Sequence, residues 1–498
     1  MNIQNRNFRF FSLVFAVMLL LQLAACGNGS NNGNTEFPVV VFSDLHFNPY
    51  YDPSLFQQLV AADASHWEDV FKTSKITTPS AWGQDIDSPL LKDTNYPLLL
   101  LALSSIKQNL GTSPLVIFAG DFLGHGIPQQ FYPRYYAGLG ISPAPATPDA
   151  AAVAAMKSFT NKTLAFVMGQ VRASVGNRPV MFSLGNNDSY SGYGPNQNSS
   201  FTLDNSFLAD NAELFYTTFL KGTADHQEFL STFTSGGYYS AEPPGTNVMV
   251  IGLNTILCTT LFYPVQGVND SAVATELDWL DARLTAAKVA GKKVLLLMHA
   301  PPGVDVGSTV GKSAIPINTT TATMMWWPAY QSRFLKILSN YPGTVSLSLA
   351  GHTHMDDYRI LTPSDTLEII PAIASYSGNN PAFRVFTVSR DTFKPIDYSS
   401  MNFDLATNPA QFNAYYTFSA AYSLQGDLDA SLRQLAPTLA SNASKQALYR
   451  GFFYSGHNSP VSSTDTQINP VTNTNWPLYW CGIGNMEQQQ YIDCVNSY

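Results

Sequence analysis

Charged side chains are scarce in this chain. Only 12% of its 498 residues are Asp, Glu, Lys or Arg, whereas about a quarter is usual for globular proteins. The 26 Lys and Arg are outnumbered by 35 Asp and Glu, so the net charge is −9. This balance argues against a nucleic-acid-binding surface, which needs a basic patch. A site for an anionic substrate would have to obtain positive charge locally, for example from a metal ion.

The apolar run near the N-terminus is too short for a membrane-spanning helix. It covers residues 10–23, whereas a spanning helix needs about 20 apolar residues. Arg6 and Arg9 before it and the small residues Ala24 and Ala25 after it predict a secretory signal peptide over residues 1–25.

With Cys26, this segment resembles a bacterial lipobox. The cysteine would then be lipidated and would anchor an exported lipoprotein in the bacterial cell envelope, on the outer membrane or facing the periplasm. Release from the cell, or an ordinary signal peptide with a chance cysteine, is the alternative. Residues 26–36 are rich in Gly and Asn, which predicts a flexible tether.

The chain has four cysteines. Export permits a disulfide, and Cys481 and Cys494 would close a short loop near the C-terminus, so we expect these two to pair. Cys258 follows an apolar stretch and is predicted to be a buried thiol. A serine hydrolase finds no support, because a Gly-x-Ser-x-Gly elbow is missing.

Apolar runs of strand length alternate with segments of helical periodicity. The strand candidates are rich in Val, Ile, Leu and Phe and lie at 37–42, 115–119, 180–184, 248–253, 294–298 and 345–350. The helical candidates lie at 96–110, 150–175, 272–290 and 330–340. This alternation predicts an α/β architecture with buried strands. Strands at 367–373 and 382–388 and a helical stretch at 405–450 are expected after them.

Asp, His or Asn side chains directly follow five of the predicted strands. The segments are SDLH (43–46), GDFLGH (120–125), GNND (185–188), His299 and GHTH (351–354). Open α/β sheets form their ligand crevice at the carboxyl ends of the strands. Carboxylates, imidazoles and amide oxygens bind divalent metals, and paired ions serve phosphoryl displacement. The sequence therefore predicts a two-metal site at these ends.

Together, these segments resemble a known family. FSDLHF, FAGDFLGH, LGNND, MHAPPG and AGHTH are similar to the five blocks of the calcineurin-like metallophosphoesterase superfamily. WGQDIDSPLL (82–91), GGYYS (236–240) with GLNT (252–255), and YSGNNPAFRVF (376–386) resemble its acid sphingomyelinase-like phosphodiesterase family. The resemblance implies a metallophosphoesterase-type α/β/β/α sandwich over 37–400, with a mostly helical C-terminal extension over 401–498 packed on it.

The resemblance also implies a ligand set for two divalent metal ions, most often zinc, with manganese or iron as alternatives. Asp121 would bridge the two ions. The first ion would also take Asp44, His46 and His354, and the second would take Asn186, His299 and His352. His125 matches the position proposed to protonate the leaving oxygen; orienting a neighbouring side chain is its alternative role.

The implied activity is hydrolysis of phosphodiesters, of phosphocholine type or of nucleotides, by a metal-bridging hydroxide. The expected partners are a small phosphoester or phospholipid headgroup and, through the lipid anchor, a membrane. Many family members have a His where this chain has Asn187. An amide can donate to phosphate but cannot deliver a proton, so Asn187 stays a catalytic candidate and the acid role moves to His125.

Two other functions remain open from the sequence. The Gly-Asn-Asn-Asp segment, and the lack of room for a lipid-presenting domain before residue 37, favour a phosphomonoesterase or pyrophosphatase that acts on nucleotides or polyphosphate. The other is a non-catalytic, metal-binding surface lipoprotein. It is disfavoured because every expected ligand position is filled.

Overall fold

The computed structural model describes residues 35–79, 93–192, 194, 196–197, 203–260, 270–312, 314–407, 409–457 and 470–498. The chain divides into two units, residues 1–36 and 37–498. Apart from Glu36, the first residue of the first strand, every described helix and strand belongs to the second unit. The predicted signal peptide, Cys26, most of the predicted tether and the WGQDIDSPLL segment lie outside the described residues.

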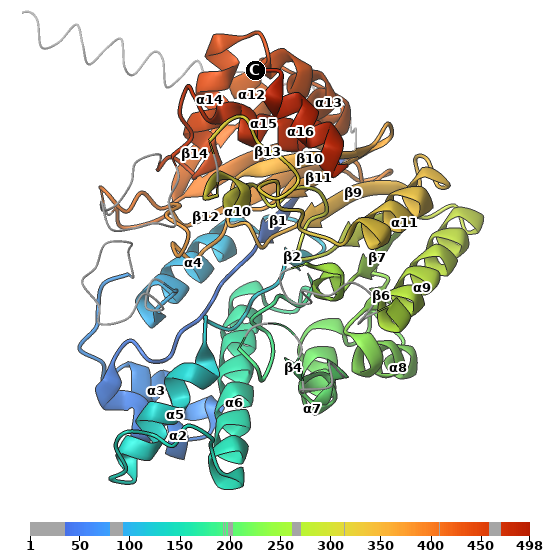
Figure 1. The fold of residues 1–498 in the computed structure, drawn as a ribbon. Coiled ribbons are helices and arrows are strands. Elements are labelled where there is room, and N and C mark those ends of the chain that lie inside the picture. The colour runs from blue at the N-terminus through green and yellow to red at the C-terminus, as the bar shows by residue number, and fades with distance from the viewer. Residues whose placement is uncertain are drawn as a thin grey trace, which may run out of the picture. The chain divides into compact units, whose positions relative to one another are not determined.

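Two six-stranded sheets form the centre of the second unit (Figure 1). The first sheet has the order β14 (Asn413–Thr417), β13 (Pro395–Asn402), β12 (Ala382–Ser389), β1 (Glu36–Phe42), β2 (Val116–Phe118) and β3 (Val180–Phe182). The second has the order β10 (Asp357–Thr362), β11 (Asp365–Ile369), β9 (Val345–Ala350), β8 (Lys293–Leu297), β7 (Val248–Gly252) and β6 (Tyr239–Ala241).

Parallel strands form one side of the first sheet and the middle of the second. In the first sheet β1, β2 and β3 are parallel, with Val40 opposite Val116 and Val116 opposite Val180. In the second sheet β11, β9, β8 and β7 are parallel. The antiparallel neighbours are β12 and β13, β13 and β14, β10 and β11, and β6 and β7. Parallel neighbours end at the same edge of a sheet, so the loops that come after them gather there.

The helices between and beyond these strands complete the fold. They are α2 (Phe56–Ala61), α3 (Trp67–Phe71), α4 (Tyr96–Asn109), α5 (Ile127–Gly138), α6 (Ala150–Val175), α7 (Ser206–Phe215), α8 (His226–Gly236), α9 (Asp270–Val289), α10 (Val306–Val310), α11 (Pro328–Ser339), α12 (Phe418–Tyr422), α13 (Leu428–Leu439), α14 (Ala443–Phe453), α15 (Trp476–Gly484) and α16 (Gln488–Asn496). A short ribbon pairs β4 (Asn196–Gln197) with β5 (Leu203–Asp204).

The side chains of β8 show why the layers stack as they do. Leu295 and Leu297 belong to the same apolar cluster as Val39 and Val41 of β1, so one face of the second sheet packs on the first sheet. Val294 and Leu296 belong to a second cluster, which includes α9 and α11 residues. Successive side chains of a strand point to opposite faces, and both faces here are buried. The side chains of α4 and α6 join the first cluster, which confirms the predicted α/β/β/α sandwich.

The predicted strands and the four predicted helices are found within a few residues of their expected bounds. Two helix starts are explained by the local sequence, because side chains of Asn95 and Asp149 accept hydrogen bonds from the backbone N–H groups of Leu98 and Ala152. Such capping satisfies backbone donors that the first turn leaves unpaired.

The C-terminal region differs from the expected run of helix. The prediction of helix over 405–450 is wrong at residues 413–417, where β14 pairs with β13 and extends the first sheet. Helices α13 and α15 contact β11 and β10 (Figure 1). Cys481 and Cys494 form the expected disulfide between α15 and α16, and Cys258 is a buried free thiol. Among the described residues, no helix has the length and apolar character to cross a membrane.

Candidate metal centre

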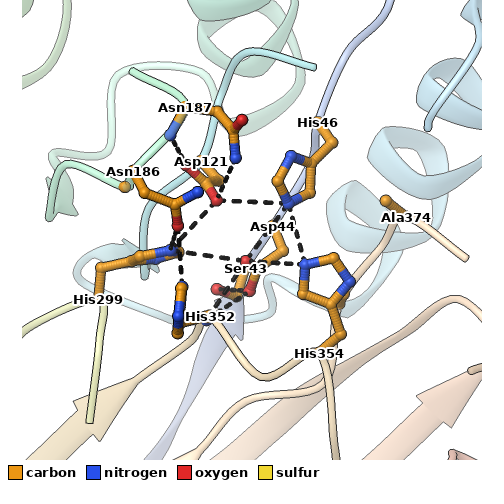
Figure 2. Close-up of polar contacts among 12 residues, drawn as sticks. Ser43, Asp44, His46, Asp121, Asn186, Asn187, His299, His352, His354 and Ala374 are labelled. Atoms are coloured by element: carbon orange, nitrogen blue, oxygen red, sulfur yellow. Dashed lines mark hydrogen bonds and ion pairs between the residues drawn. The ribbon is translucent and has the colours of Figure 1, made fainter. Parts of the chain in front are cut away.

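All seven predicted metal ligands gather where the strands of the two sheets end (Figure 2). The loops after β1, β2 and β3 carry Asp44, His46, Asp121 and Asn186. The loops after β8 and β9 carry His299, His352 and His354. The two sheets therefore supply opposite sides of one cluster, from segments as far apart in sequence as residues 44 and 354.

Unusual backbone conformations aim these side chains. The described part of the chain has eight non-glycine residues with positive φ, and five are predicted ligands: Asp44 (50°), His46 (42°), Asp121 (62°), His352 (71°) and His354 (66°). Each such residue costs on the order of 1–3 kcal/mol, and the cost is typically carried at functional sites. A positive φ interrupts the alternation of side chains that a strand imposes, so that residues such as Asp44 and His46 can face the same point.

Gly185 and Gly351 allow the loops to approach one another closely. A Cβ atom at Gly185 would overlap the carboxylate of Asp121, and one at Gly351 would overlap the hydroxyl of Ser43 and crowd Asp44. Glycine is therefore required at both positions for close approach rather than for chain reversal.

One half of the cluster surrounds Asp44. Its Oδ1 lies 3.6 Å from Nε2 of His46 and 3.4 Å from Nε2 of His354, and these two nitrogens are 3.0 Å apart. The Nδ1–H of His46 donates to the carbonyl of Leu123 (3.2 Å), while Nδ1 of His354 meets the hydroxyl of Ser377 (3.2 Å). With Nδ1 as the donor, Nε2 of His46 presents a lone pair to the cluster.

The other half of the cluster surrounds the amide oxygen of Asn186. This Oδ1 lies 3.2 Å from Nε2 of His299 and 2.8 Å from Nδ1 of His352. The Nδ1–H of His299 donates to the carbonyl of Ala119 (2.7 Å), so its Nε2 also presents a lone pair. Orienting bonds of this kind are usual for imidazoles that bind metals.

Both carboxylates lie between the two halves. Oδ2 of Asp121 is 3.4 Å from Nε2 of His46 and 3.2 Å from Nε2 of His299. Oδ1 of Asp44 is 3.9 Å from the same His299 nitrogen. The donor atoms of Asp44, His46 and His354 lie within 4.8 Å of one another, as do those of Asp44, Asp121 and His299.

This arrangement brings carboxylates, imidazoles and an amide oxygen together, and the described part of the chain adds no lysine or arginine to them. Among the described residues, no lysine or arginine forms an ion pair with Asp44 or Asp121. Burial lowers the pKa of His46 and of His299, but the charges of Asp121 and Asp44 and the hydrogen bonds to each ring together raise each pKa to about 9. A divalent cation would take the place of the proton on Nε2. The cluster thus favours positive charge. Nitrogen and oxygen donors of this kind suit zinc, manganese or iron, so the set fits divalent cations.

Asn187 contacts the carboxylate of Asp121 rather than facing away from the cluster. Its backbone N–H donates to Oδ1 (2.7 Å) and its side-chain Nδ2 donates to Oδ2 (3.0 Å). Its own Oδ1 is buried and finds no partner in the described part of the chain. In this position Asn187 orients Asp121, and its predicted contact with phosphate stays a prediction.

Asp188 joins the loops that come after β2 and β3. Its carboxylate accepts hydrogen bonds from the backbone N–H groups of Gly185 (2.9 Å), Asp121 (3.1 Å), Phe122 (2.9 Å) and Leu123 (3.1 Å). Burial and the charge of Asp121 raise its pKa to about 7. The bond to Gly185 lies within the loop after β3, and the three others connect this loop to the loop after β2, so Asp188 holds Asp121 and Gly185 side by side.

His125 lies beside the cluster and is held by a residue that sequence reasoning missed. The Asp93 carboxylate accepts from the backbone N–H of His125 (2.8 Å) and from its Nδ1 (2.6 Å). The His125 ring stacks between His46 (centroids 4.2 Å apart, 16°) and Tyr376 (3.8 Å, 14°). With Nδ1 bound to Asp93, Nε2 of His125 is the atom left to exchange a proton. Nothing in the sequence around Asp93 signals this pairing.

Comparisons with known proteins find similar sequences over most of this chain. Residues 37–356, which include all seven predicted ligands, match the calcineurin-like phosphoesterase family. The cyclic GMP-AMP phosphodiesterase SMPDL3A of Rattus norvegicus is 24% identical over 477 residues, which cover 91% of this chain and 90% of that protein. Sphingomyelinase phosphodiesterase D of Dictyostelium discoideum is 24% identical over 490 residues (92% and 96%). The sphingomyelin phosphodiesterase of Homo sapiens is 29% identical over 170 residues (32% and 23%).

Proposed function

Because the chain belongs to the calcineurin-like phosphoesterase family, we propose that it hydrolyses phosphodiesters with two divalent metal ions. The observation that carries this proposal is the convergence of two carboxylates, four imidazoles and one amide oxygen beside the His125–Asp93 pair. Relatives named as phosphodiesterases match more than nine-tenths of this chain, which supports a diester over a monoester. The substrate class we propose is a phosphocholine-type or nucleotide diester.

In this proposal the two halves of the cluster hold one ion each, and zinc is the expected metal. Asp44, His46 and His354 would hold the first, while Asn186, His299 and His352 would hold the second, with Asp121 between them. When bound, two such ions polarise phosphoryl oxygens and lower the pKa of water. Metal analysis of the purified protein tests this: two zinc ions per chain are expected, and other stoichiometries or metals would revise it.

His125 is the proposed general acid. Asp93 fixes its Nδ1–H, so the proton on Nε2 can be directed at the leaving oxygen. The stack against His46 and Tyr376 restricts how the imidazole ring can turn. Asp93 is therefore a positioning residue in this proposal.

A leaving-group comparison tests the acid role. His125→Ala should slow hydrolysis of diesters with alkoxide leaving groups by about 10²–10⁴-fold, because an alkoxide needs a proton to depart. Hydrolysis of 4-nitrophenyl diesters should change far less, because 4-nitrophenolate leaves without one. His226→Ala is a control, since His226 is exposed and pairs with Glu213 away from the cluster. Equal losses on both classes of diester would reject the acid role.

We also propose that the protein is exported and anchored to a membrane by a lipid on Cys26, in a bacterial cell envelope. The support is the basic, apolar and small-residue pattern of residues 1–26. Labelling with a radioactive fatty acid should mark the wild type and fail to mark Cys26→Ala. A labelled variant, or an unlabelled wild type, would contradict the anchor.

The division into a catalytic domain over 37–400 and an extension over 401–498 is likewise proposed. Its support is that the five helices α12–α16 all follow β14 in the chain. The boundary at residue 400 falls within β13. Limited proteolysis between β14 and α13 that leaves the two fragments associated is the expected result.

A further inference from the structure

The loop that comes before β12 contacts two residues of the proposed active site. It covers residues 374–380. Within it, the ring of Tyr376 stacks on His125 (centroids 3.8 Å apart, 14°), and the hydroxyl of Ser377 meets Nδ1 of His354 (3.2 Å). The conformation of this loop therefore bears on the proposed general acid and on a proposed metal ligand.

Tyr376 and Ser377 are the two central residues of a tight turn. The N–H of Gly378 donates to the carbonyl of Ser375 (3.0 Å), which closes the four-residue turn. The φ of Gly378 is +82°, a left-handed value that glycine adopts readily. A contact that holds Gly378 therefore limits how far the turn, and with it both central side chains, can shift.

The segment after α14 holds this loop from the C-terminal region. Nδ1 of His457 lies 2.6 Å from the carbonyl oxygen of Gly378, and since a carbonyl can only accept, the Nδ1–H of His457 donates. The carbonyls of Tyr454 and Ser455 accept from the backbone N–H and from the side-chain Nδ2 of Asn380 (3.1 Å each). The C-terminal segment makes the bonds to Asn380 with its main chain and the bond to Gly378 with the side chain of His457.

The same segment also bonds to the loop that carries His354. The carbonyl of Phe453 accepts from the backbone N–H of Asp356 (2.9 Å), two residues after His354. Phe453 is 4% exposed and Ser455 is 0% exposed, so water does not compete strongly for these bonds. His457 and the 374–380 loop both lie outside residues 37–356, which match the phosphoesterase family. This support for the site is therefore not part of that match.

We infer that His457 is a positioning residue for phosphodiester hydrolysis and acts through Gly378 on Tyr376 and Ser377. This inference rests on the proposed function. The bond from His457 keeps the turn in the conformation in which Tyr376 stacks on His125. The imidazole of His125 then keeps the orientation in which its Nε2 faces the leaving oxygen.

The same bond also acts on the first metal site, through Ser377. With the Nδ1–H of His354 donating to the Ser377 hydroxyl, Nε2 of His354 is left to bind an ion. Bonds of this kind orient the imidazoles that bind metals. Loss of the His457 bond should therefore disturb both the proton transfer and the binding of one ion, and separate measurements detect the two effects.

Two variants that branch at Cγ, as histidine does, test the bond itself. His457→Asn keeps a side-chain N–H close to the position of Nδ1, whereas His457→Leu places a methyl group there. For diesters with alkoxide leaving groups, His457→Leu is expected to lower kcat about tenfold with little change in KM. The loss should be smaller for 4-nitrophenyl diesters, which need no proton to leave, and His457→Asn should resemble the wild type.

The substrates are matched pairs that differ in the leaving group. One pair is glycerophosphocholine and 4-nitrophenyl phosphorylcholine, and the other is dithymidine monophosphate and thymidine 5′-(4-nitrophenyl) phosphate. Equal losses on both members of a pair in His457→Leu, or a loss in His457→Asn as large as that in His457→Leu, would overturn the inference. Should His457→Leu fail to fold, His457→Gln takes its place, because its amide lies one bond farther from Cβ.

Phe452→Leu is the matched control for a general loosening of the C-terminal region. Phe452 belongs to α14, and its ring contacts Tyr415, Tyr416 and Tyr422. We expect this variant to lose stability to urea while the ratio of rates within each substrate pair stays at the wild-type value. A change of that ratio as large as in His457→Leu would assign the effect to packing and contradict the role of His457.

Ser377→Ala tests the metal part of the inference. Removal of the hydroxyl is expected to weaken the binding of one zinc ion about 10–100-fold, measured by competition with a chromophoric chelator. Ser377→Thr keeps a hydroxyl and should restore the affinity, and His457→Leu should weaken the same ion. Unchanged zinc affinity in Ser377→Ala and in His457→Leu would remove the metal part of the inference.

A measurement on the metal-free protein uses no activity. The chain has eight histidines, so the imidazole C–H signals of histidine-labelled protein can be resolved by NMR, and His125→Ala identifies the signal of His125. The ring current of Tyr376 should shift this signal upfield. The shift should shrink in Tyr376→Leu and in His457→Leu, and it should persist in His457→Asn.

The NMR result separates this inference from the proposed function. If no diester is hydrolysed with added zinc or manganese, the proposed function fails, and the His125 signal still shows whether His457 holds the turn. If the diesters are hydrolysed but the His125 signal and the leaving-group dependence are unchanged in His457→Leu, only the inference about His457 fails.

Discussion

Two clusters of buried carboxylates in this molecule are neutralised in different ways. Around Arg384, the guanidinium donates to Glu368 (2.6 Å) and to Asp356 (2.5 Å), and the ring of Tyr398 lies 4.2 Å from it. At the metal centre, Asp44 and Asp121 meet imidazoles and an amide instead of a fixed cation. The first cluster contains a permanently charged guanidinium, whereas the imidazoles of the second can exchange their protons for a metal ion. We therefore expect a structural role for the first and cation binding at the second.

A further buried carboxylate, that of Glu276, forms no ion pair with an arginine or a histidine among the described residues. Glu276 is 2% exposed, and one oxygen accepts from the backbone N–H of Asn254 (2.7 Å). Burial raises its pKa to about 8, so it keeps a proton at neutral pH. An arginine, a proposed metal ion and a proton are thus three ways to offset the free-energy cost of removing a carboxylate from water.

Among the variants considered, replacement of Asp121, the carboxylate between the two halves of the metal centre, is expected to have the largest effect. Asp121→Asn keeps the size of the side chain but not its charge, so both halves of the cluster lose an anionic ligand. We expect activity to fall more than about 1000-fold, since the metals contribute several kcal/mol to the transition state, and metal content to fall below two ions per chain. Full metal content with near-normal turnover would contradict the proposed role of Asp121.

Removing the chain's own cation should affect stability instead. Arg384→Met leaves Glu368 and Asp356 buried and unpaired, which costs about 3–5 kcal/mol. Urea denaturation should show this loss, and added zinc should not reverse it. A triple variant that also carries Glu368→Gln and Asp356→Asn should recover much of the stability. No recovery would mean that charge compensation is not what Arg384 provides.

A smaller effect is expected at Asn187. Asn187→Ala removes the side-chain donor to Asp121 while leaving every ligand in place, so activity should fall about 10–100-fold, as for other residues that orient metal ligands. Asn247→Ala serves as a control, because Asn247 is exposed and bonds to Gly291 far from the cluster in sequence. An unchanged kcat in Asn187→Ala would mean that Asp121 holds its position without this bond.

The smallest and most pH-dependent effect concerns Glu276. Its pKa is raised on folding, so the folded state binds more protons than the unfolded state between about pH 4.5 and 8. Stability should therefore fall as pH rises through this window, by up to about 1.4 kcal/mol per pH unit, and level off above it. In Glu276→Gln this contribution should be missing, so that stability falls less steeply with pH than in the wild type, with the larger gain over wild type at pH 8. Parallel pH profiles of the two proteins would show that Glu276 does not titrate as inferred.

The local parts of the site could be predicted because they come directly after strands. A buried strand and the polar residues after it are contiguous in sequence, so SDLH, GDFLGH, GNND and GHTH could be recognised without knowing the fold. Asp93 could not be assigned to His125 in this way, since nothing around either residue signals the other. The strand β14 could not be predicted either, because its pairing with β13 outweighed the helical pattern of residues 405–450.

By itself, the sequence determined the alternation of strands and helices through its apolar periodicity, and it indicated the Cys481–Cys494 pairing through their short separation. The resemblance of its short motifs to a known family implied the sandwich and the seven candidate ligands. Only the tertiary structure decided that Asn187 and Asp188 of the GNND segment orient and tie down Asp121, and that Asp93 holds His125. It also decided that His457, after α14, bonds to the loop of Tyr376 beside the metal centre. Those contacts join residues tens to hundreds of positions apart, and their geometry depends on packing that no local pattern records.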